Sequence, residues 1–296
     1  MDKDTHINGQ ERHQGSDTKF IPMGSITSGS GREAAKDVYY YTDQIVNVIF
    51  IGDPEDGKWV LVDAGLPNAA EEIKNVADDR FGSGSKPEAI ILTHGHFDHV
   101  GGIVDLVNEW EVPVYAHKLE LPYLTGQERY PKPDPTVEGG LLAKISPIYP
   151  IEPTQLGDAV HPLPDDHTVP GLTEWSWIHT PGHAPGHVSL FRERDRVLIA
   201  GDAFTTVRQD SFYKVLTQKQ EVHGPPRYLT TDWDASRESV KKLAALKPET
   251  AVTGHGVVMS GKELADGLQH LADHFDEIAV PDYGRYVDRR NKKDEQ

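Results

Sequence analysis

Apolar and polar positions follow one another along the chain in a way that predicts strands alternating with helices. Short runs rich in β-branched residues, Ile45 to Ile51 and Trp59 to Val62, flank a turn-like segment from Asp53 to Gly57. They predict an antiparallel opening. Helical spacing follows in two stretches, Ile103 to Trp110 and Leu264 to Ile278. Strands that alternate with helices indicate a layered α/β domain.

The same pattern divides the chain into three parts. Residues 1–35 are polar and rich in Gly and Ser, so we expect a disordered or loosely docked N-terminal arm. The folded domain is predicted over residues 36–280, and residues 281–296 are interpreted as a C-terminal tail. Ser260 and Glu263 have the spacing of a capping box and predict the start of the last long helix.

One segment of the domain has an unusual composition. Residues 121–153 contain seven prolines in 33 positions, and so many prolines prevent a long regular element. The segment is interpreted either as a crossing loop or as a wall over a pocket, because long ordered loops often carry function.

Composition and charge exclude several classes of protein. The 296 residues include 30 basic and 47 acidic side chains, for a net charge of −17, which disfavours a nucleic-acid partner. Cysteine is absent, so disulfides, thiolate ligands and a cysteine nucleophile are excluded, and a metal site must use nitrogen and oxygen. No apolar run approaches the roughly 18 residues of a membrane span, and the first residues have no apolar signal core. We therefore expect a cytoplasmic protein without a membrane partner.

Four apolar, strand-like runs each end in a residue of a type that binds metals. The runs begin near Ala89, Trp177, Val197 and Thr250, and the residues that follow them are His94, His183, Asp202 and His255. If these strands belong to one system of sheets, their ends meet at one rim, where layered α/β proteins place their sites. A single histidine is usually an ordinary surface or core residue, but four such endings together indicate a metal site.

The first of these endings is the densest. Residues 94 to 99 contain three imidazoles and one carboxylate, namely His94, His96, Asp98 and His99. Side chains two residues apart in an extended segment face the same way. His94 and His96 can therefore bind one metal ion, while Asp98 and His99, past the turn, reach a second. We assign His94, His96 and His183 to one ion and Asp98, His99 and His255 to the other, with Asp202 as a bridge. This pattern leaves room for a shared water, as in catalytic rather than structural sites.

These motifs, in this order, resemble the metallo-β-lactamase superfamily over about residues 38 to 280. They comprise the run from His94 to His99, Thr180-Pro181-Gly182-His183, Gly201-Asp202 and Gly254-His255. The resemblance implies a four-layer αββα sandwich with a dinuclear site at one edge. It also implies that Asp63, in Val62-Asp63-Ala64-Gly65, is a buried partner that orients a ligand such as His94.

The function predicted from this site is hydrolysis of a small-molecule ester, lactone or related carboxylic derivative by a metal-bridging hydroxide. Zinc is the first choice of metal, with manganese, iron or cobalt also suited to histidine and aspartate. Asp98 is assigned a catalytic role besides ligation, since it would orient the hydroxide and carry its proton to the leaving group. The alternatives are a mononuclear iron dioxygenase acting on a sulfur substrate and a phosphodiesterase. The oligomeric state is left open.

Residues around the expected site narrow the substrate only partly. N-acyl homoserine lactonases, which resemble this chain in their ligands, carry a tyrosine three residues after the bridging aspartate, where this chain has Thr205. Aromatic residues between Phe204 and Trp233, and tyrosines of the proline-rich segment such as Tyr130, either line a pocket or pack under loops. His187 is expected to support the site without binding metal. His270 and His274 are expected to be solvated on a helix.

Overall fold

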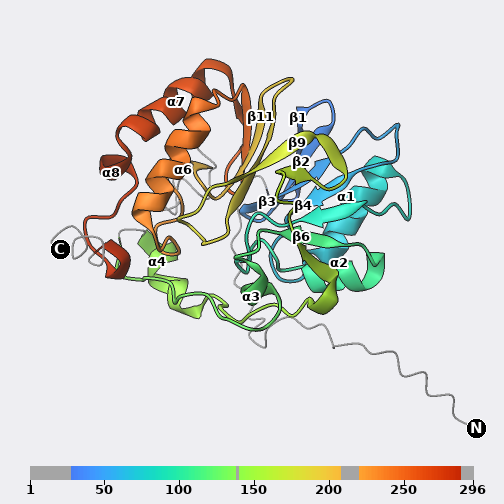
Figure 1. Cartoon of the computed structure of the whole chain (residues 1–296), viewed down its shortest axis with the longest axis horizontal. Coiled ribbons are helices and arrows are strands. Elements are labelled where there is room, and N and C mark those ends of the chain that lie inside the picture. The colour runs from blue at the N-terminus through green and yellow to red at the C-terminus, as the bar shows by residue number, and fades with distance from the viewer. Residues whose placement is uncertain (1–27, 138–139, 208–219, 288–296) are drawn as a thin grey trace, which may run out of the picture.

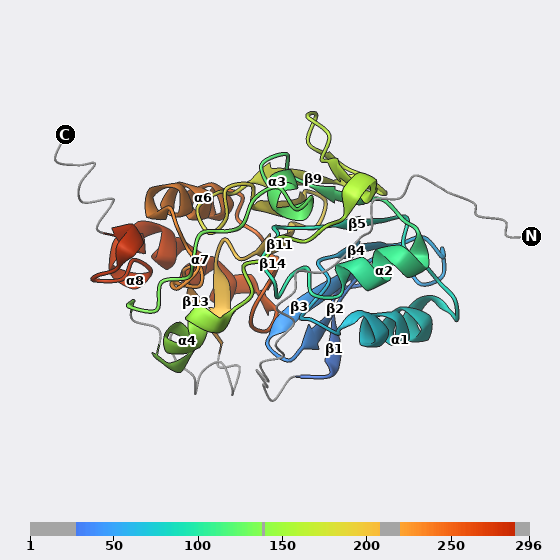
Figure 2. The same ribbon diagram turned by 90° about the horizontal axis from the view of Figure 1, so that it is seen from below.

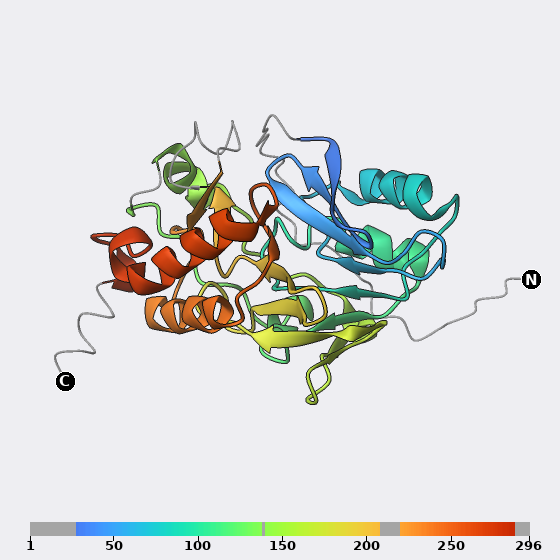
Figure 3. The same ribbon diagram turned by 90° about the horizontal axis from the view of Figure 1, so that it is seen from above.

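A computed structural model describes residues 28–137, 140–207 and 220–287, and every structural statement below refers to them. Two sheets pack face to face, and helices cover the outer face of each (Figure 1). Seen from above, the two helical layers lie on opposite sides of the pair of sheets (Figure 3). The predicted four-layer αββα sandwich is confirmed.

The first sheet has seven strands in the order of the chain. They are β1 Ser30–Ala35, β2 Val38–Asp43, β3 Val46–Ile51, β4 Val60–Val62, β5 Ala89–Ile91, β6 Val114–Ala116 and β7 Val160–Pro162. Strands β1 to β4 are antiparallel, with Ile49 opposite Val62, which confirms the predicted opening. Strands β4 to β7 are parallel, so the ends of β4 and β5 point to the same edge.

The second sheet has six strands in the order β15-β14-β11-β10-β9-β8. They are β8 Thr168–Val169, β9 Leu172–His179, β10 Val188–Arg192, β11 Val197–Gly201, β14 Thr250–Thr253 and β15 Met259–Ser260. Strands β11 and β14 are parallel neighbours, so their carboxyl ends lie side by side. A separate pair, β12 Thr205–Val207 and β13 Gln220–His223, follows β11.

Apolar side chains fill all three interfaces of the sandwich. Between the sheets, residues such as Ile49 and Val62 of the first sheet share a cluster with Leu190 and Ile199 of the second. Strands β5 and β11 are buried along their whole length, which explains why they read as continuous apolar runs rather than as alternating ones. Burial on both faces holds these strands in place and so fixes the position of their ends.

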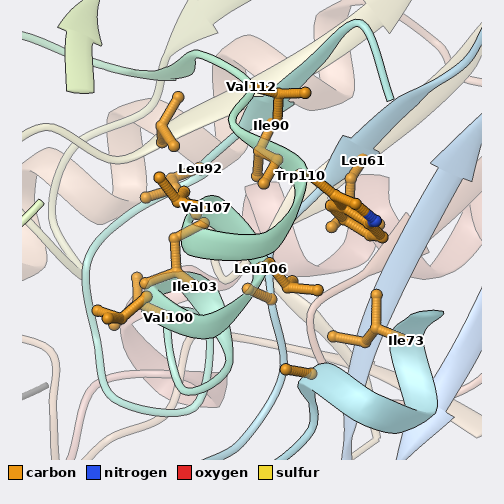
Figure 4. Packing of buried hydrophobic residues seen from close by; sticks show 14 of the residues in the cluster. Leu61, Ile73, Ile90, Leu92, Val100, Ile103, Leu106, Val107, Trp110 and Val112 are labelled. Carbon is orange, nitrogen blue, oxygen red and sulfur yellow. The ribbon is translucent and has the colours of Figure 1, made fainter. Parts of the chain in front are cut away.

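Helices α1 Ala70–Phe81 and α2 Ile103–Trp110 cover the outer face of the first sheet. Ile103, Leu106 and Trp110 bury the predicted helical stripe in this cluster (Figure 4). The outer face of the second sheet is covered by α6 Trp233–Ala245 and α7 Gly261–Asp273, with the short α8 Phe275–Ile278 after them. None of the helices in the described ranges is long and apolar enough to cross a membrane.

Two local predictions for the last helices were imprecise. The stripe from Leu264 to Ile278 is shared by α7 and α8, because the backbone leaves helical geometry at His274. The predicted helix start is confirmed, because α7 begins at Gly261 with Ser260 before it, but the Ser260 side chain makes no capping hydrogen bond. Ser260 pairs with Thr250 as the last residue of β15, so its extended backbone serves the sheet instead.

Both predicted terminal boundaries also need correction. Residues 30–35 were assigned to a loose arm, but they form β1, which pairs with β2 along its length. Tyr286 and Val287 were assigned to a tail, yet they are buried in the cluster under α6 and α7. The rest of the predicted arm and tail, residues 1–27 and 288–296, lies outside the described residues.

The proline-rich segment lies along one edge of the sandwich. It contains the short helices α3 Leu121–Leu124 and α4 Gly140–Ile145 and the 3₁₀ turn η1 Ser146–Ile148, and a second turn, η2 Gly157–Ala159, leads into β7. In Figure 1 it runs along the lower edge from α3, on the side of the first sheet, to α4, on the side of α6 and α7. The view from below places α3 and α4 apart in the same way (Figure 2). The segment therefore spans both halves of the molecule.

Candidate metal centre

The four runs that end in metal-type residues are all strands, as predicted. They are β5 in the first sheet and β9, β11 and β14 in the second. Backbone hydrogen bonds join the two sheets where these strands end. The N–H of Val188 donates to Thr93 O at 2.9 Å, and the N–H of Asn47 donates to Gly254 O at 2.8 Å. The strand ends therefore meet at one edge of the sandwich.

All seven predicted ligands gather at this edge, and none is more than 5% exposed. His94, His96 and His183, here called the three-histidine group, have ligand atoms within 4.8 Å of one another, and so do Asp98, His99 and His255, called the Asp98 group. A third set, His94, His99 and Asp202, connects them. The fold thus brings together the side chains that the sequence grouped, and their roles as metal ligands stay a prediction.

Asp202 lies between the two groups. Its Oδ2 is 3.4 Å from His183 Nε2 in the first group, and 3.3 Å from His255 Nε2 in the second. His255 Nε2 is also 3.4 Å from Asp98 Oδ2. Ligands about 2.0–2.1 Å from a tetrahedral zinc ion are themselves about 3.3–3.4 Å apart. These separations therefore suit ligands of shared ions, with Asp202 in the bridging place.

Several buried polar atoms at the centre have no partner within the described part of the chain. They are His94 Nε2, His99 Nε2, Asp98 Oδ1 and Asp202 Oδ1. Buried polar groups without partners are rare, and each one calls for an explanation. Imidazole nitrogens and carboxylate oxygens that converge in this way fit one or more divalent cations.

The electrostatic environment differs between the two groups. Burial disfavours the charged imidazole, so it lowers the pKa of His183 well below its ordinary value and that of His96 to about 4. Burial acts in the same direction on His255, but the carboxylates of Asp202 and Asp98 outweigh it and raise the pKa of His255 to about 10. The Asp98 group thus stabilises positive charge, whereas burial keeps the three-histidine group neutral.

Asp63 supports the centre, although its direct partner is not the expected one. It is fully buried, and its Oδ2 accepts from His99 Nδ1 at 2.8 Å, not from His94. The link to His94 is indirect, because Thr93 Oγ1 lies 2.8 Å from Asp63 Oδ2 and 3.0 Å from His94 Nδ1. Asp63 therefore holds the far nitrogen of His99, which leaves its Nε2 free to face the centre.

Other imidazoles of the centre are held from behind as well. His255 Nδ1 donates to Ile45 O at 2.9 Å. His183 Nδ1 lies 3.2 Å from the hydroxyl of Thr230, which itself donates to Pro226 O, so the imidazole is the donor. Thr230 was not predicted, since no local motif singles out a threonine 47 residues away.

His187 supports the centre without belonging to either group, as expected. Its Nε2 accepts the backbone N–H of Asp202 at 2.8 Å, and its Nδ1 lies 2.9 Å from Thr180 Oγ1. Burial lowers the pKa of His187 to about 3, so the ring stays neutral and can accept. It therefore holds the backbone of the bridging aspartate.

Sequence reasoning missed Glu120 and left Tyr130 unassigned. The buried Glu120 carboxylate accepts the N–H of Gly95 at 2.9 Å and the N–H of Gly186 at 2.7 Å. Tyr130 hydrogen-bonds to Glu120, and its ring centroid lies 4.4 Å from that of His96. The proline-rich segment thus touches the metal centre. Only its prolines signalled such a role, and nothing local marked Glu120.

The other candidate side chains divide between core and site. Phe204 and Trp233 pack in the cluster under α6 and α7, which is the ordinary packing alternative. Tyr149 contacts both Tyr228 and Phe97, the residue between His96 and Asp98, with ring centroids 5.7 and 5.1 Å apart. The remaining candidates Phe212 and Tyr213 lie outside the described residues, and His270 and His274 are exposed as expected.

Comparison with known proteins gives concordant matches. The family model described as the metallo-beta-lactamase superfamily matches residues 41–255. The probable metallo-hydrolase YflN of Bacillus subtilis (strain 168) is 51% identical over 260 residues, which cover 88% of this chain and 98% of the relative. The probable metallo-hydrolase YybB of the same organism is 31% identical over 211 residues, covering 71% and 80%. Among solved structures, TTHA1623 in a di-iron-bound form is similar with a TM-score of 0.52 and 27% identity, covering 75% of this chain and 93% of that one.

Proposed function

Because this chain belongs to the metallo-beta-lactamase superfamily and is a metallo-hydrolase, we propose that it holds two divalent metal ions and hydrolyses an ester, lactone or related carboxylic derivative. The three-histidine group would bind one ion and the Asp98 group the other, and Asp202 would contact both. The observation that carries the proposal is the set of buried, unpartnered nitrogen and oxygen atoms that converge between these groups.

Two bound ions would lower the pKa of a shared water to about 7 and polarise the carbonyl oxygen of the substrate. The chain would supply the proton transfer. Asp98 has one oxygen 3.4 Å from His255 and a second, Oδ1, without a partner in the described residues. We assign to Oδ1 the task of accepting the proton of the attacking water and returning it to the leaving group. No serine or cysteine nucleophile is required.

The substrate class is supported by charge and by the residues near the bridge. A net charge of −17 disfavours polyanions such as nucleic acids and leaves small neutral substrates favoured. Thr205 cannot take the place of a phenol that stabilises the developing oxyanion, because its single hydroxyl proton is donated to Val207 O at 2.7 Å. Activity that depends on such a phenol at this position is therefore not expected.

Metal identity is also part of the proposal. Histidine and aspartate ligands suit zinc, which we place first, and suit manganese, iron and cobalt nearly as well. TTHA1623 has been solved with two irons, which supports iron as the second metal to test. A cytoplasmic location remains our expectation.

The proposal is tested by reconstitution and a substrate panel. Protein stripped with a chelator is loaded with zinc, manganese, iron or cobalt, metal per chain is measured, and lactones, aryl esters, thioesters, β-lactams and phosphodiesters are assayed. We expect close to two ions per chain and hydrolysis of carboxylic derivatives that is lost on stripping. Asp202→Asn should lower both the metal content and the hydrolytic activity. Asp134 is also a buried carboxylate, bonded to Thr136, and Asp134→Asn should change neither.

Three outcomes would overturn the proposal. One iron per chain with oxygen consumption on a sulfur substrate would indicate the mononuclear dioxygenase. Activity confined to phosphodiesters would indicate a phosphodiesterase. A protein that stays empty in excess zinc, manganese and iron would remove the metal site itself.

A further inference from the structure

We propose that Glu120, with Tyr130 as its partner, is a positioning residue that sets the spacing of the two loops carrying the three-histidine group. The inference rests on the proposed function, because it concerns the metal site assigned there. It adds a residue from the proline-rich side of the molecule to a centre whose other parts come from the ends of strands.

The two loops belong to different sheets. Gly95 lies between His94 and His96, just after β5 of the first sheet, while Gly186 follows His183 in the turn between β9 and β10 of the second. One carboxylate joins them, since Glu120 Oε2 accepts from Gly95 N–H at 2.9 Å and Glu120 Oε1 accepts from Gly186 N–H at 2.7 Å. Glu120 therefore adds a second link between these two parts of the metal site, besides the hydrogen bond from Val188 N–H to Thr93 O.

A carboxylate satisfies this arrangement better than an amide does. Besides the two backbone N–H groups, the hydroxyl of Tyr130 points at Glu120 Oε2, so three donors converge on two oxygens. An ionised carboxylate accepts at both oxygens, whereas the NH₂ group of an amide only donates. In either orientation, a glutamine at this position would direct an NH₂ group against at least one backbone N–H. With the NH₂ toward Gly186, the N–H of Gly186 would lose the Glu120 acceptor; with the NH₂ toward Gly95, that N–H would keep only the Tyr130 hydroxyl, which accepts it at 2.9 Å.

The glycines of the two loops let the pair come this close. A Cβ atom built at Gly95 would lie 2.8 Å from Tyr130 Oη, and one built at Gly186 would lie 2.8 Å from Glu120 Cγ. Both distances are too short for any side chain to be accommodated without a shift. Tyr130 and Glu120 therefore occupy space that is free only because Gly95 and Gly186 have no side chains.

The pair is rigidly held on its own side. The N–H of Glu120 donates to His117 O at 2.8 Å, and its carbonyl accepts from Leu124 N–H at 3.1 Å at the start of α3. The ring of Tyr130 is stacked on that of Tyr123, with centroids 4.0 Å apart, and its other neighbour is His96 at 4.4 Å. The phenol thus restrains the ring of one ligand while its hydroxyl contacts the carboxylate.

The test compares Glu120→Gln and Tyr130→Phe with Tyr123→Phe, which removes a hydroxyl from the neighbouring ring of the stack. Zinc affinity of each site is measured by competition with a chromophoric chelator, and the visible absorption of cobalt-loaded protein reports the geometry of each site. For E120Q we expect about a 10- to 100-fold loss of affinity at the three-histidine site and an altered cobalt spectrum. The Asp98 site should change by a smaller factor, because Glu120 bonds to the backbone of Gly95 and Gly186 and to none of that site's ligands. Y130F should lower the zinc affinity of the three-histidine site by a smaller factor, and Y123F should bind zinc with the affinities of the wild type.

The outcomes separate this inference from the proposed function. Two ions in the wild type with equal losses at both sites in E120Q, or no loss at either, would refute the positioning role and leave the hydrolase proposal intact. A wild type that binds no metal would remove the proposed function itself. A residue that only stabilised the fold would lower the melting temperature without changing the ratio of the two affinities. If E120Q fails to fold, the ratio of the two zinc affinities in Y130F tests the positioning role instead.

Discussion

Replacing Asp63 by asparagine is expected to weaken metal binding at the Asp98 group alone. The change keeps size and shape, and the backbone at Asp63, with φ of 62°, is a conformation that asparagine also tolerates. Asp63 accepts from the backbone N–H and hydroxyl of Thr93 and from His99 Nδ1, each at 2.8 Å by its closest oxygen. In the variant the amide oxygen can stay with the Thr93 N–H, which turns the NH₂ group toward His99.

The physical consequence is a change of tautomer. With Asp63 as acceptor, His99 carries its proton on Nδ1 and presents the lone pair of Nε2 to the centre. Facing an NH₂ group, Nδ1 must accept instead, so the proton moves to Nε2, the atom that is to bind the ion. Loss of such a partner typically costs 10- to 100-fold in metal affinity, or about 1.4–2.7 kcal/mol. The stripped protein should also lose about 1 kcal/mol of stability, because a hydrogen bond to a charged carboxylate is replaced by one between neutral groups.

Calorimetric titration of zinc into stripped protein measures this prediction. The wild type should show two binding steps, and D63N should weaken one of them within the stated range while the step of the three-histidine group stays unchanged. D134N is the matched control, since Asp134 is equally buried and accepts from the N–H and hydroxyl of Thr136. Equal weakening of both steps, or two unaltered steps, would refute the tautomer argument.

Three further predictions concern stability and metal removal. The carboxylate of Asp37 holds the guanidinium of Arg192, which is 1% exposed, through bonds of 2.6 and 2.8 Å, and Asp195 also accepts from it; because Asp195 remains as a partner, D37N should cost about 1.5 kcal/mol in urea unfolding. Burial raises the pKa of Asp37, but Arg192 outweighs it and lowers that pKa below the ordinary 3.8; the difference from wild type should be full at neutral pH and shrink as the pH falls below about 4. Gly201→Ala should destabilise the protein by about 1–3 kcal/mol and weaken metal binding, because φ is 55° and the new Cβ would lie 2.6 Å from His187 Nε2. Chelation should lower the melting temperature, with each ion at 1,000 times its Kd contributing about 4 kcal/mol.

Each of these has a contrary result. A pH-independent cost of D37N would show that the carboxylate charge is not what stabilises Arg192. For Gly201, the control is Gly57→Ala in an exposed turn, where φ is also positive but no atom lies near the added Cβ. Equal effects of the two alanines would show that backbone conformation alone matters. A melting temperature unchanged by chelation, in protein shown to contain metal, would mean that the ions do not couple to folding.

Much of the fold was predictable because its signals are local. The strands that carry the site are buried on both faces, so β5 and β11 appear as continuous apolar runs that stop at a polar residue. The ligands follow directly after these runs, and their types limit the chemistry to a metal site of nitrogen and oxygen. The spacing of the side chains from His94 to His99 is also visible in the sequence, which is why their division into two groups could be predicted from residue order.

Features that depend on a partner far away in the sequence could not be predicted from local patterns. Ser30–Ala35 has no strong apolar pattern, and it becomes a strand because β2 offers an edge to pair with. Ser260 has the residues of a capping box around it, yet pairing with Thr250 determines its backbone. Tyr286, at the predicted tail, is buried because it packs in the hydrophobic cluster under α6 and α7. Local propensity is weaker than tertiary burial in each case.

The sequence by itself identified which residues have the chemistry to bind metal and which strands they follow along the chain. Only the tertiary structure decided what holds them: Asp63 on His99 rather than on His94, Thr230 behind His183, and Glu120 between two loops of different sheets. A ligand is recognised by its own chemistry and its neighbours in sequence. A supporting residue is defined by direction and distance across the fold, and these exist only once the two sheets have packed and their edges have met.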